Sequence, residues 1–315
     1  MRWVSRKSGE YLLRKINKQE KSLGPRSADT ARIIEAFEKG RAENTDRLQG
    51  LAQRLNELAP INRAMGLGRI PKIAARIIRA YDELDLVGKQ ILIVGTNAMF
   101  AYEAAAGVHF SSDLLATGDV DLLLDARRQL RLAAVDRTVS ENGLFGVLRR
   151  VDTSFATRGR GDFRASNRDG YLVDLICPQP KDPLREAPNR LTDAVDDFVA
   201  AEIKGLAWLA NAPRYSECVI DDDGFPVQIA TIDPRVFALH KAWLAEQDDR
   251  SALKRHRDRS QAEAVGEMSK KYLNLSFDSH QLAVLPAAIR RLSDRLVPKP
   301  SSEPIEIKRS TRPDW

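Results

Sequence analysis

The stretch ATGDVDLLLDA, at residues 116–126, places two aspartates one residue apart inside an apolar run. Side chains alternate between the two faces of a β-strand, so Asp119 and Asp121 project on one face, about 7 Å apart at roughly 3.3 Å per residue. Val120 and Leu122 then face a hydrophobic core. Two like charges on one face of a buried strand are costly unless a positive group lies beside them. The stretch therefore predicts a strand whose aspartates meet a basic side chain or a metal ion.

A third aspartate stands alone in a second apolar segment, GYLVDLIC at residues 170–177. Carboxylate oxygens are the ligands that Mg²⁺ prefers, and the ion commonly shares its remaining positions with substrate phosphates. A third carboxylate on a neighbouring strand allows two ions to hold the attacking and leaving oxygens of an in-line displacement. We therefore expect Asp174 and the first two aspartates to bind two Mg²⁺ or Mn²⁺ ions. The alternatives are a strand-edge position, or an ion pair of Asp174 with Arg164 or Arg168.

The segment QILIVGTNAMFAYEAAAG, at residues 90–107, predicts a short buried strand, a Gly-Thr turn and an alanine-rich helix that ends at Gly107. Free backbone N–H groups at the start of a helix bind phosphate readily. Gly95 lets the backbone approach closely, and the Thr96 hydroxyl can donate to a phosphate oxygen. We expect both residues to bind nucleotide phosphates.

The order of the expected elements indicates an α+β fold. Residues 1–88 are expected to be all helical, and residues 89–232 to form a mixed-sheet core that includes two hairpins, at 162–178 and 214–231. A second helical region follows at residues 233–297, and its first helix has Asp233 as cap and Pro234 at the first position. Residues 298–315 are polar and proline-rich, which predicts a flexible tail.

Charge is concentrated at the start of the chain, which has 315 residues and a net charge of +6. Residues 1–26 hold two glutamates and eight basic residues, namely Arg2, Arg6, Lys7, Arg14, Lys15, Lys18, Lys21 and Arg26. This arm alone carries +6, and the rest of the chain is balanced. A basic arm beside a neutral body attracts a polyanion such as nucleic acid. The alternative is a solvated helix whose apolar residues pack inward.

Two charged residues lie on otherwise apolar helix faces. Lys241 shares a face with Phe237 and Leu244, which suits either a triphosphate contact or a lysine whose ammonium reaches solvent. Asp258 is expected to point inward. There it would orient Lys241, hold a nucleotide base or pair with Lys254. The neighbouring arginines 255, 257 and 259 are expected on a solvated or RNA-facing side, and His240 and His256 as structural or surface residues.

VGTNAMFAYE, GDVDLLLD and YLVDLI, in that order, resemble the nucleotidyltransferase fold of the DNA polymerase β superfamily. A wider match, which includes FALHKAWL and RHRDRSQA, is similar to a bacterial nucleotidyltransferase-like family. The second half is also similar to nucleotidyltransferase toxins of abortive-infection and toxin–antitoxin systems. That resemblance implies nucleotide-binding roles for Lys241 and for the Arg257-Asp258 pair. The chain between Thr96 and Asp119 is longer than in compact members, and its extra segment, GVHFSSDLLATG, is expected to shape a substrate pocket.

The resemblance implies a metal-dependent nucleotidyltransferase. An acceptor hydroxyl attacks the α-phosphorus of an NTP and pyrophosphate leaves, with Asp119, Asp121 and Asp174 as catalytic and metal-binding residues. Gly95, Thr96, Lys241 and Asp258 hold the nucleotide. RNA, particularly tRNA, is the first candidate acceptor, and a protein hydroxyl or a small molecule is the alternative. A binding protein without turnover, or an interaction scaffold led by the N-terminal segment, is the competing class.

Cellular location and further partners follow from composition and from the same resemblance. Cys177 and Cys218 lack metal-type spacing and are expected to be free thiols. The start of the chain lacks the apolar core of a signal peptide, and no apolar run approaches the roughly 20 residues that cross a bilayer. We expect a cytoplasmic protein that does not bind membranes. The similarity to toxins adds an antitoxin-type protein as a partner.

Overall fold

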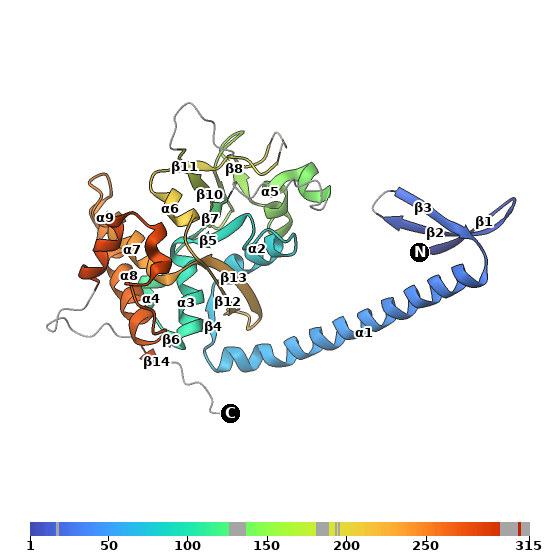
Figure 1. Ribbon diagram of the computed structural model, residues 1–315, viewed down its shortest axis with the longest axis horizontal. Helices are drawn as coiled ribbons and strands as arrows, with labels where there is room; N and C mark the ends of the chain where they lie inside the picture. Colours follow the sequence, from blue (N-terminus) through green and yellow to red (C-terminus); the bar gives the residue numbers. More distant parts are fainter. Residues whose placement is uncertain are drawn as a thin grey trace. The chain divides into compact units, whose positions relative to one another are not determined.

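The chain divides into two compact units, Met1–Ile61 and Asn62–Trp315. A computed structural model describes residues 1–16, 19–125, 137–180, 189–192, 194, 196–296 and 308–309 (Figure 1). The expected flexible tail lies outside these residues, except that Lys308–Arg309 form a short strand, β14, which pairs with β6 at Val108–His109.

The first unit begins with a three-stranded antiparallel sheet and continues into one long helix. Strands β1 (Arg2–Arg6), β2 (Gly9–Ile16) and β3 (Gln19–Pro25) pair in sequence order, and α1 spans Ala28–Ala64. The helical prediction for the segment that forms these strands is therefore wrong. Leu12 and Leu13 suggested one face of a helix, but they lie on opposite faces of β2 and both are buried. Gly9, at φ 123°, follows the turn between the first two strands.

The second unit is built on a mixed six-stranded sheet, which confirms the α+β class. Its main order is β5-β7-β10-β9-β8, and β11 pairs with the far end of β10. The central pair β7 and β10 is parallel, whereas β5 and β9 run antiparallel to their neighbours. The strands are β5 (Ile91–Val94), β7 (Asp119–Leu124), β8 (Ala156–Thr157), β9 (Arg164–Ser166), β10 (Leu172–Pro178) and β11 (Ala201–Ile203).

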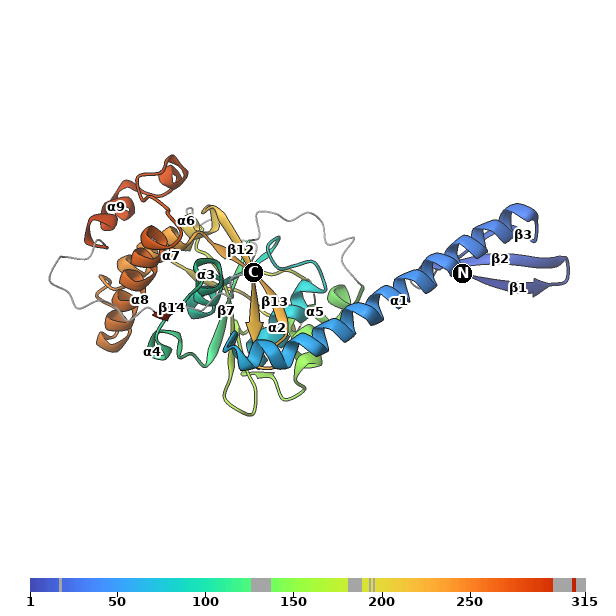
Figure 2. The same ribbon diagram turned by 90° about the horizontal axis from the view of Figure 1, so that it is seen from below.

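Helices surround this sheet and make up most of the C-terminal part of the described chain. The expected strand, turn and helix after residue 90 are present as β5, the 3₁₀ turn η1 (Gly95–Asn97) and α3 (Ala98–Ala106). Helices α7 and α8 pack against each other, as both views show (Figures 1 and 2). The remaining helices are α2 (Lys72–Asp82), α4 (Ser112–Leu115), α5 (Arg137–Val151), α6 (Leu206–Ala210), α7 (Pro234–Leu244), α8 (Ala252–Lys271), η4 (His280–Val284), α9 (Ala287–Arg290) and η5 (Arg291–Arg295).

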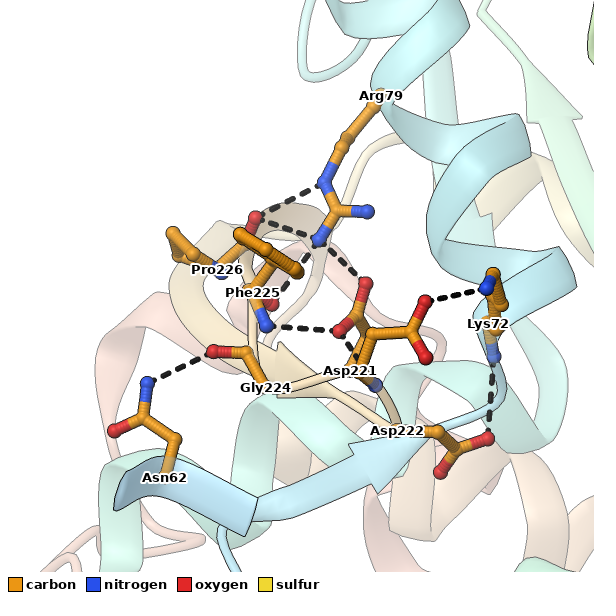
Figure 3. A network of polar contacts seen from close by, with 9 residues as sticks. Asn62, Lys72, Arg79, Asp221, Asp222, Gly224, Phe225 and Pro226 are labelled. Atoms are coloured by element: carbon orange, nitrogen blue, oxygen red, sulfur yellow. Dashed lines mark hydrogen bonds and ion pairs between the residues drawn. The ribbon is translucent and has the colours of Figure 1, made fainter. Parts of the chain in front are cut away.

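The second expected hairpin forms a separate small sheet. Strands β12 (Arg214–Asp221) and β13 (Pro226–Ile232) are antiparallel, and β4 (Gly68–Ile70) pairs with β12. Asp221 is buried at the hairpin turn, where its carboxylate accepts the backbone N–H of Phe225 and lies 2.7 Å from Nη2 of Arg79 on α2 (Figure 3). This network fixes the hairpin to α2 and satisfies a buried charge.

Along the described part of the chain, no helix has both the length and the apolar character needed to cross a membrane.

Candidate functional site

The candidate site is a row of residues that crosses four neighbouring strands at one level. Asp121 on β7 pairs in register with Val94 on β5 and with Asp174 on β10, and Asp174 pairs in register with Arg164 on β9. Directly paired residues project on the same face of a sheet, and neighbouring strands lie about 4.8 Å apart. The structure therefore brings two of the three predicted aspartates side by side, with Asp119 two residues earlier on the same face.

Asp121 carries charge that its surroundings do not neutralise. Burial raises the pKa of its carboxyl to about 7, and the nearby carboxylates of Asp119 and Asp174 contribute to that rise. Lys241 and Arg164 act in the opposite direction without cancelling the effect. Such convergence of carboxylates is what a bound cation relieves.

Gly95 belongs to this site by close contact with Asp121. Its φ is 64°, in the left-handed region, and a Cβ placed on it would lie 2.1 Å from Oδ2 of Asp121. Only glycine fits both the backbone conformation and the space. The group in contact is a carboxylate, so phosphate binding by Gly95 stays a prediction.

Thr96, the other predicted phosphate-binding residue, is buried and joined to α8. Its Oγ1 accepts hydrogen bonds from Nη2 of Arg257, at 3.2 Å, and from Nε2 of Gln261, at 3.3 Å. The hydroxyl keeps its own proton to donate. Arg257 also donates to the carbonyl of Ala116, so this half-buried arginine contacts the site, and its expected RNA contact stays a prediction. Asn97 supplies a further link, since its Nδ2 donates to the carbonyl of Asp119 at 2.7 Å.

Asp174 forms the ion pair that the sequence left open as an alternative. Nε and Nη2 of Arg164 donate to its two carboxylate oxygens, at 2.7 and 2.5 Å. Within the described residues, no group of three or more His, Cys, Asp and Glu side chains is arranged to hold a metal ion. The guanidinium thus holds both oxygens of Asp174, and metal binding by Asp119, Asp121 and Asp174 stays a prediction.

Lys241 and Asp258 are brought together between α7 and α8. Lys241 Nζ lies 2.9 Å from one carboxylate oxygen of Asp258, and Arg250 Nε lies 2.7 Å from the other. Lys241 is buried, so it does not extend its ammonium to solvent. Burial lowers the pKa of Lys241, and the Asp258 carboxylate opposes that effect. Burial alone would raise the pKa of Asp258, but Lys241 and Arg250 together lower it. Asp258 and the nearby Asp121 thus oppose the loss of the Lys241 proton that burial favours.

Several residues of the site were missed or misplaced by sequence reasoning. Gln261 lies four residues after Arg257, so helical spacing could have placed both on one face of α8. Arg250 precedes α8 and has no periodic signal. The extra segment before Asp119 contacts α8 through the carbonyls of Leu114 and Ala116. Its expected role in shaping a substrate pocket stays a prediction.

A pocket of about 500 Å³ opens beside the start of β7. Gly118, which precedes Asp119, and Tyr171, which precedes β10, form part of its lining. Lys72 and Arg76 of α2 bring positive charge to it, and Asp152, Asp169 and Asp222 bring negative charge. The pocket thus offers polar surface next to the first carboxylate of the site.

Comparison with known proteins places the chain in a family. A family model described as nucleotidyltransferase matches residues 72–285, which is more than half of the chain and includes every site residue named above. Searches of curated proteins and of solved structures gave no match.

Proposed function

The chain belongs to the nucleotidyltransferase family, and we propose that it transfers the NMP part of an NTP to a hydroxyl of RNA with divalent metal ions. The observation that carries the proposal is the register of Asp121 with Asp174 beside the glycine turn at Gly95. It supports a site where a nucleotide's phosphates meet paired carboxylates. A module that only binds nucleotide has no physical need for such a costly arrangement.

Asp119 and Asp121 are the residues that would hold the divalent ion. Bound there, the ion supplies Lewis-acid polarisation of the α-phosphate and neutralises developing charge. Asp119 is oriented by Thr117, whose hydroxyl donates to its Oδ1. Asp121 is held against the Gly95 turn. Asp174 would complete the carboxylate set for a second ion if Arg164 released it, and its carboxylate would help to accept the proton of the attacking hydroxyl.

Three groups are proposed to hold the triphosphate. The backbone N–H groups that follow Gly95 lie at the start of a helical segment, where anions are favoured. The Thr96 hydroxyl donates its proton to a phosphate oxygen while α8 fixes its position. Lys241 is proposed to place a positive charge near the phosphates, and its hydrogen bond to Asp258 orients the ammonium. Transfer of this kind depends on positioning and charge more than on covalent chemistry.

RNA is proposed as the acceptor because of the sheet β1–β3. Its side chains Arg6, Arg14 and Lys15 are exposed, as is Lys21, which pairs across the strands with Arg14. Closely spaced cations on an exposed sheet attract a phosphate backbone. A protein hydroxyl or a small molecule fits the chemistry of the site but gives no reason for this charge.

A transfer assay tests the proposal. The protein is incubated with total bacterial RNA, Mg²⁺ or Mn²⁺, and each α-labelled NTP in turn. The matched variants are Asp121→Asn, in the site, and Asp278→Asn, an exposed aspartate between α8 and η4. We expect labelled RNA from the unaltered protein and from Asp278→Asn, and none from Asp121→Asn.

The alternative class gives a different result. A protein that binds nucleotide without turnover gains thermal stability with metal and NTP but labels nothing. If label appears on added protein or on a small molecule and not on RNA, RNA is rejected as the acceptor, but nucleotidyl transfer is supported. Absence of both label and stabilisation rejects the catalytic proposal.

A further inference from the structure

Helix α1 exposes a row of leucines that nothing in the proposed reaction uses. Leu48, Leu51, Leu55 and Leu58, here called the leucine seam, have exposed fractions of 66%, 48%, 38% and 49%. The helix is continuous over this region in both views (Figures 1 and 2). Large exposed apolar groups in a line mark a contact surface, because a folded chain otherwise buries them.

The spacing of the seam identifies the geometry of its partner. The leucines follow one another at intervals of three, four and three residues, the a and d positions of a heptad repeat. The same register reaches back to Ile34 and Phe37, with the polar residues Arg41 and Asn44 at the two positions between. This periodicity of 3.5 residues favours a second helix packed alongside, with knobs inserted into holes.

Residues that flank the seam allow such a contact. Ala52 follows Leu51 on one side and is small enough for a neighbouring helix to approach. On the other side, Arg47 and Arg54 each have a glutamate about one helical turn away, Glu43 and Glu57. The flanks are therefore locally neutral, and like-charge repulsion does not prevent two such helices from pairing.

We propose that α1 is a dimerisation helix, and that its leucine seam packs against the seam of a second copy of this chain. The partner must present a helix with apolar residues at the same spacing, and a second copy does so by identity in a two-fold contact. Four of every seven positions contact or flank the partner in a coiled coil, so the heptad register from Ile34 to Leu58 offers roughly 14 residues. A standard interface uses roughly 20–30 residues from each partner, so this contact is a small one.

The length of the seam sets the strength of the dimer. Uninterrupted apolar layers extend only from Leu48 to Leu58, because Arg41 and Asn44 occupy the preceding core positions. Polar residues at such positions fix register and lower stability. The dimer is therefore reversible and concentration-dependent.

Sedimentation velocity of the full-length protein over about 1 to 100 µM tests the proposal. We expect the mass to rise from 35.2 kDa towards twice that value with concentration. The variant Leu51→Glu/Leu55→Glu places charge in the centre of the seam and should raise the dissociation constant at least about tenfold. The matched control Gln49→Glu/Asn56→Glu adds the same charge to exposed positions of α1 outside the seam and should leave the dimer unchanged.

Two outcomes overturn the proposal. A monomer at every concentration means that another protein, or another part of this chain, covers the seam. A dimer that persists in the Leu51→Glu/Leu55→Glu variant means that another surface mediates it. Circular dichroism checks that the variants keep their helix content, and Leu51→Gln/Leu55→Gln replaces the glutamate variant if it does not.

Discussion

At the scale of single residues, Gly95 and Asp121 are the most tightly constrained pair in the candidate site. The glycine lies in the left-handed region of backbone space, and the carboxylate fills the place of its absent side chain. We predict that Gly95→Ala destabilises the fold by more than the roughly 1–2 kcal/mol of left-handed strain alone, and abolishes transfer. Urea unfolding and the transfer assay measure the two effects.

Gly170→Ala is the matched control for that prediction. Gly170 also has a positive φ, of 80°, but no atom lies within 4 Å of the place where its Cβ would be. Its variant therefore carries the backbone strain without the collision. Equal destabilisation by the two substitutions would show that the contact with Asp121 has no energetic weight.

Arg164 occupies both carboxylate oxygens of Asp174, the third predicted aspartate. We predict that Arg164→Gln lowers the thermal stability of the metal-free protein, because it leaves the buried Asp174 carboxylate without its ion pair. The same change frees both oxygens for a metal, so affinity for Mn²⁺ should rise, on the order of tenfold. Titration of free Mn²⁺ by electron paramagnetic resonance measures this, with Arg168→Gln as the control. Weaker Mn²⁺ binding would contradict the argument.

His240 gives the fold a dependence on pH. It is enclosed by Trp208 and Trp243, and burial lowers its pKa to about 3, with the charge of Lys241 adding to the effect. The unfolded chain takes up a proton below about pH 6.5 and the folded chain does not, so stability is full above that pH and falls as pH decreases towards 3.

The predicted contribution of His240 is about 1.4 kcal/mol per pH unit within that window. His240→Phe keeps the aromatic contacts and cannot be protonated, so its free energy of unfolding should fall less between pH 6.5 and 5 than that of the unaltered protein. Urea titrations at the two pH values measure the difference. Parallel losses of stability in both proteins would show that His240 is not the titrating group.

At the scale of elements, the contact between α7 and α8 depends on a buried charge network. Asp258→Ala leaves Lys241 and Arg250 without their shared carboxylate, so we predict a loss of about 3–5 kcal/mol in the free energy of unfolding. Adding Lys241→Met should recover part of that loss, because one unpaired cation is removed. Urea unfolding of the single and double variants measures the coupling, and additive losses would mean that the pair does not interact.

The elements that the sequence predicted well are those with strong local signals. Asp169-Gly170 and Asp223-Gly224 lie in the turns of two hairpins. Asp233 caps α7, because its side chain accepts a hydrogen bond from the backbone N–H of Arg235. The prediction for the β1–β3 segment failed because Leu12, Leu13 and Ile16 also fit helical spacing. Residues 9–16 form a strand because they pair with β1 and β3. Strand pairing depends on partner segments that a local sequence pattern does not contain.

The residues of the candidate site also divide into those with a strong local sequence signal and those without one. Asp119 and Asp121 are placed on one face by the alternation of a strand, and Gly95 by its turn, so spacing alone was enough. The partnership of Asp174 with Arg164 depends on cross-strand register, which an apolar segment does not specify. The contact of Thr96 with Gln261 joins residues 165 positions apart, which tertiary packing alone determines.

At the scale of the whole molecule, the excess positive charge lies in one small sheet. We predict that Arg14→Gln/Lys15→Gln/Lys21→Gln weakens RNA binding and flattens its salt dependence, by about 0.7–0.9 in the log–log slope for each phosphate that is no longer neutralised. Fluorescence anisotropy with labelled tRNA between low and moderate salt measures both quantities. Binding of nucleotide in the second unit should be unchanged.

The control for that prediction removes the same charge from the same unit. Arg32→Gln/Lys39→Gln/Arg41→Gln alters three exposed residues of α1. If only general electrostatics mattered, the two triple variants would bind RNA with equal affinity. A binding surface on β1–β3 predicts that the sheet variant binds RNA much more weakly than the α1 variant.

The site draws its residues from segments that the ribosome delivers far apart in time. Gly95 and the aspartates emerge first, and α8, which holds Thr96 and Lys241 in place, emerges long after Asp174. A nascent chain that stops before α8 therefore contains every carboxylate of the predicted metal site but lacks the partners that position the phosphate-binding groups. The contacts that position Thr96 and Lys241 are therefore complete only when synthesis has passed Gln261.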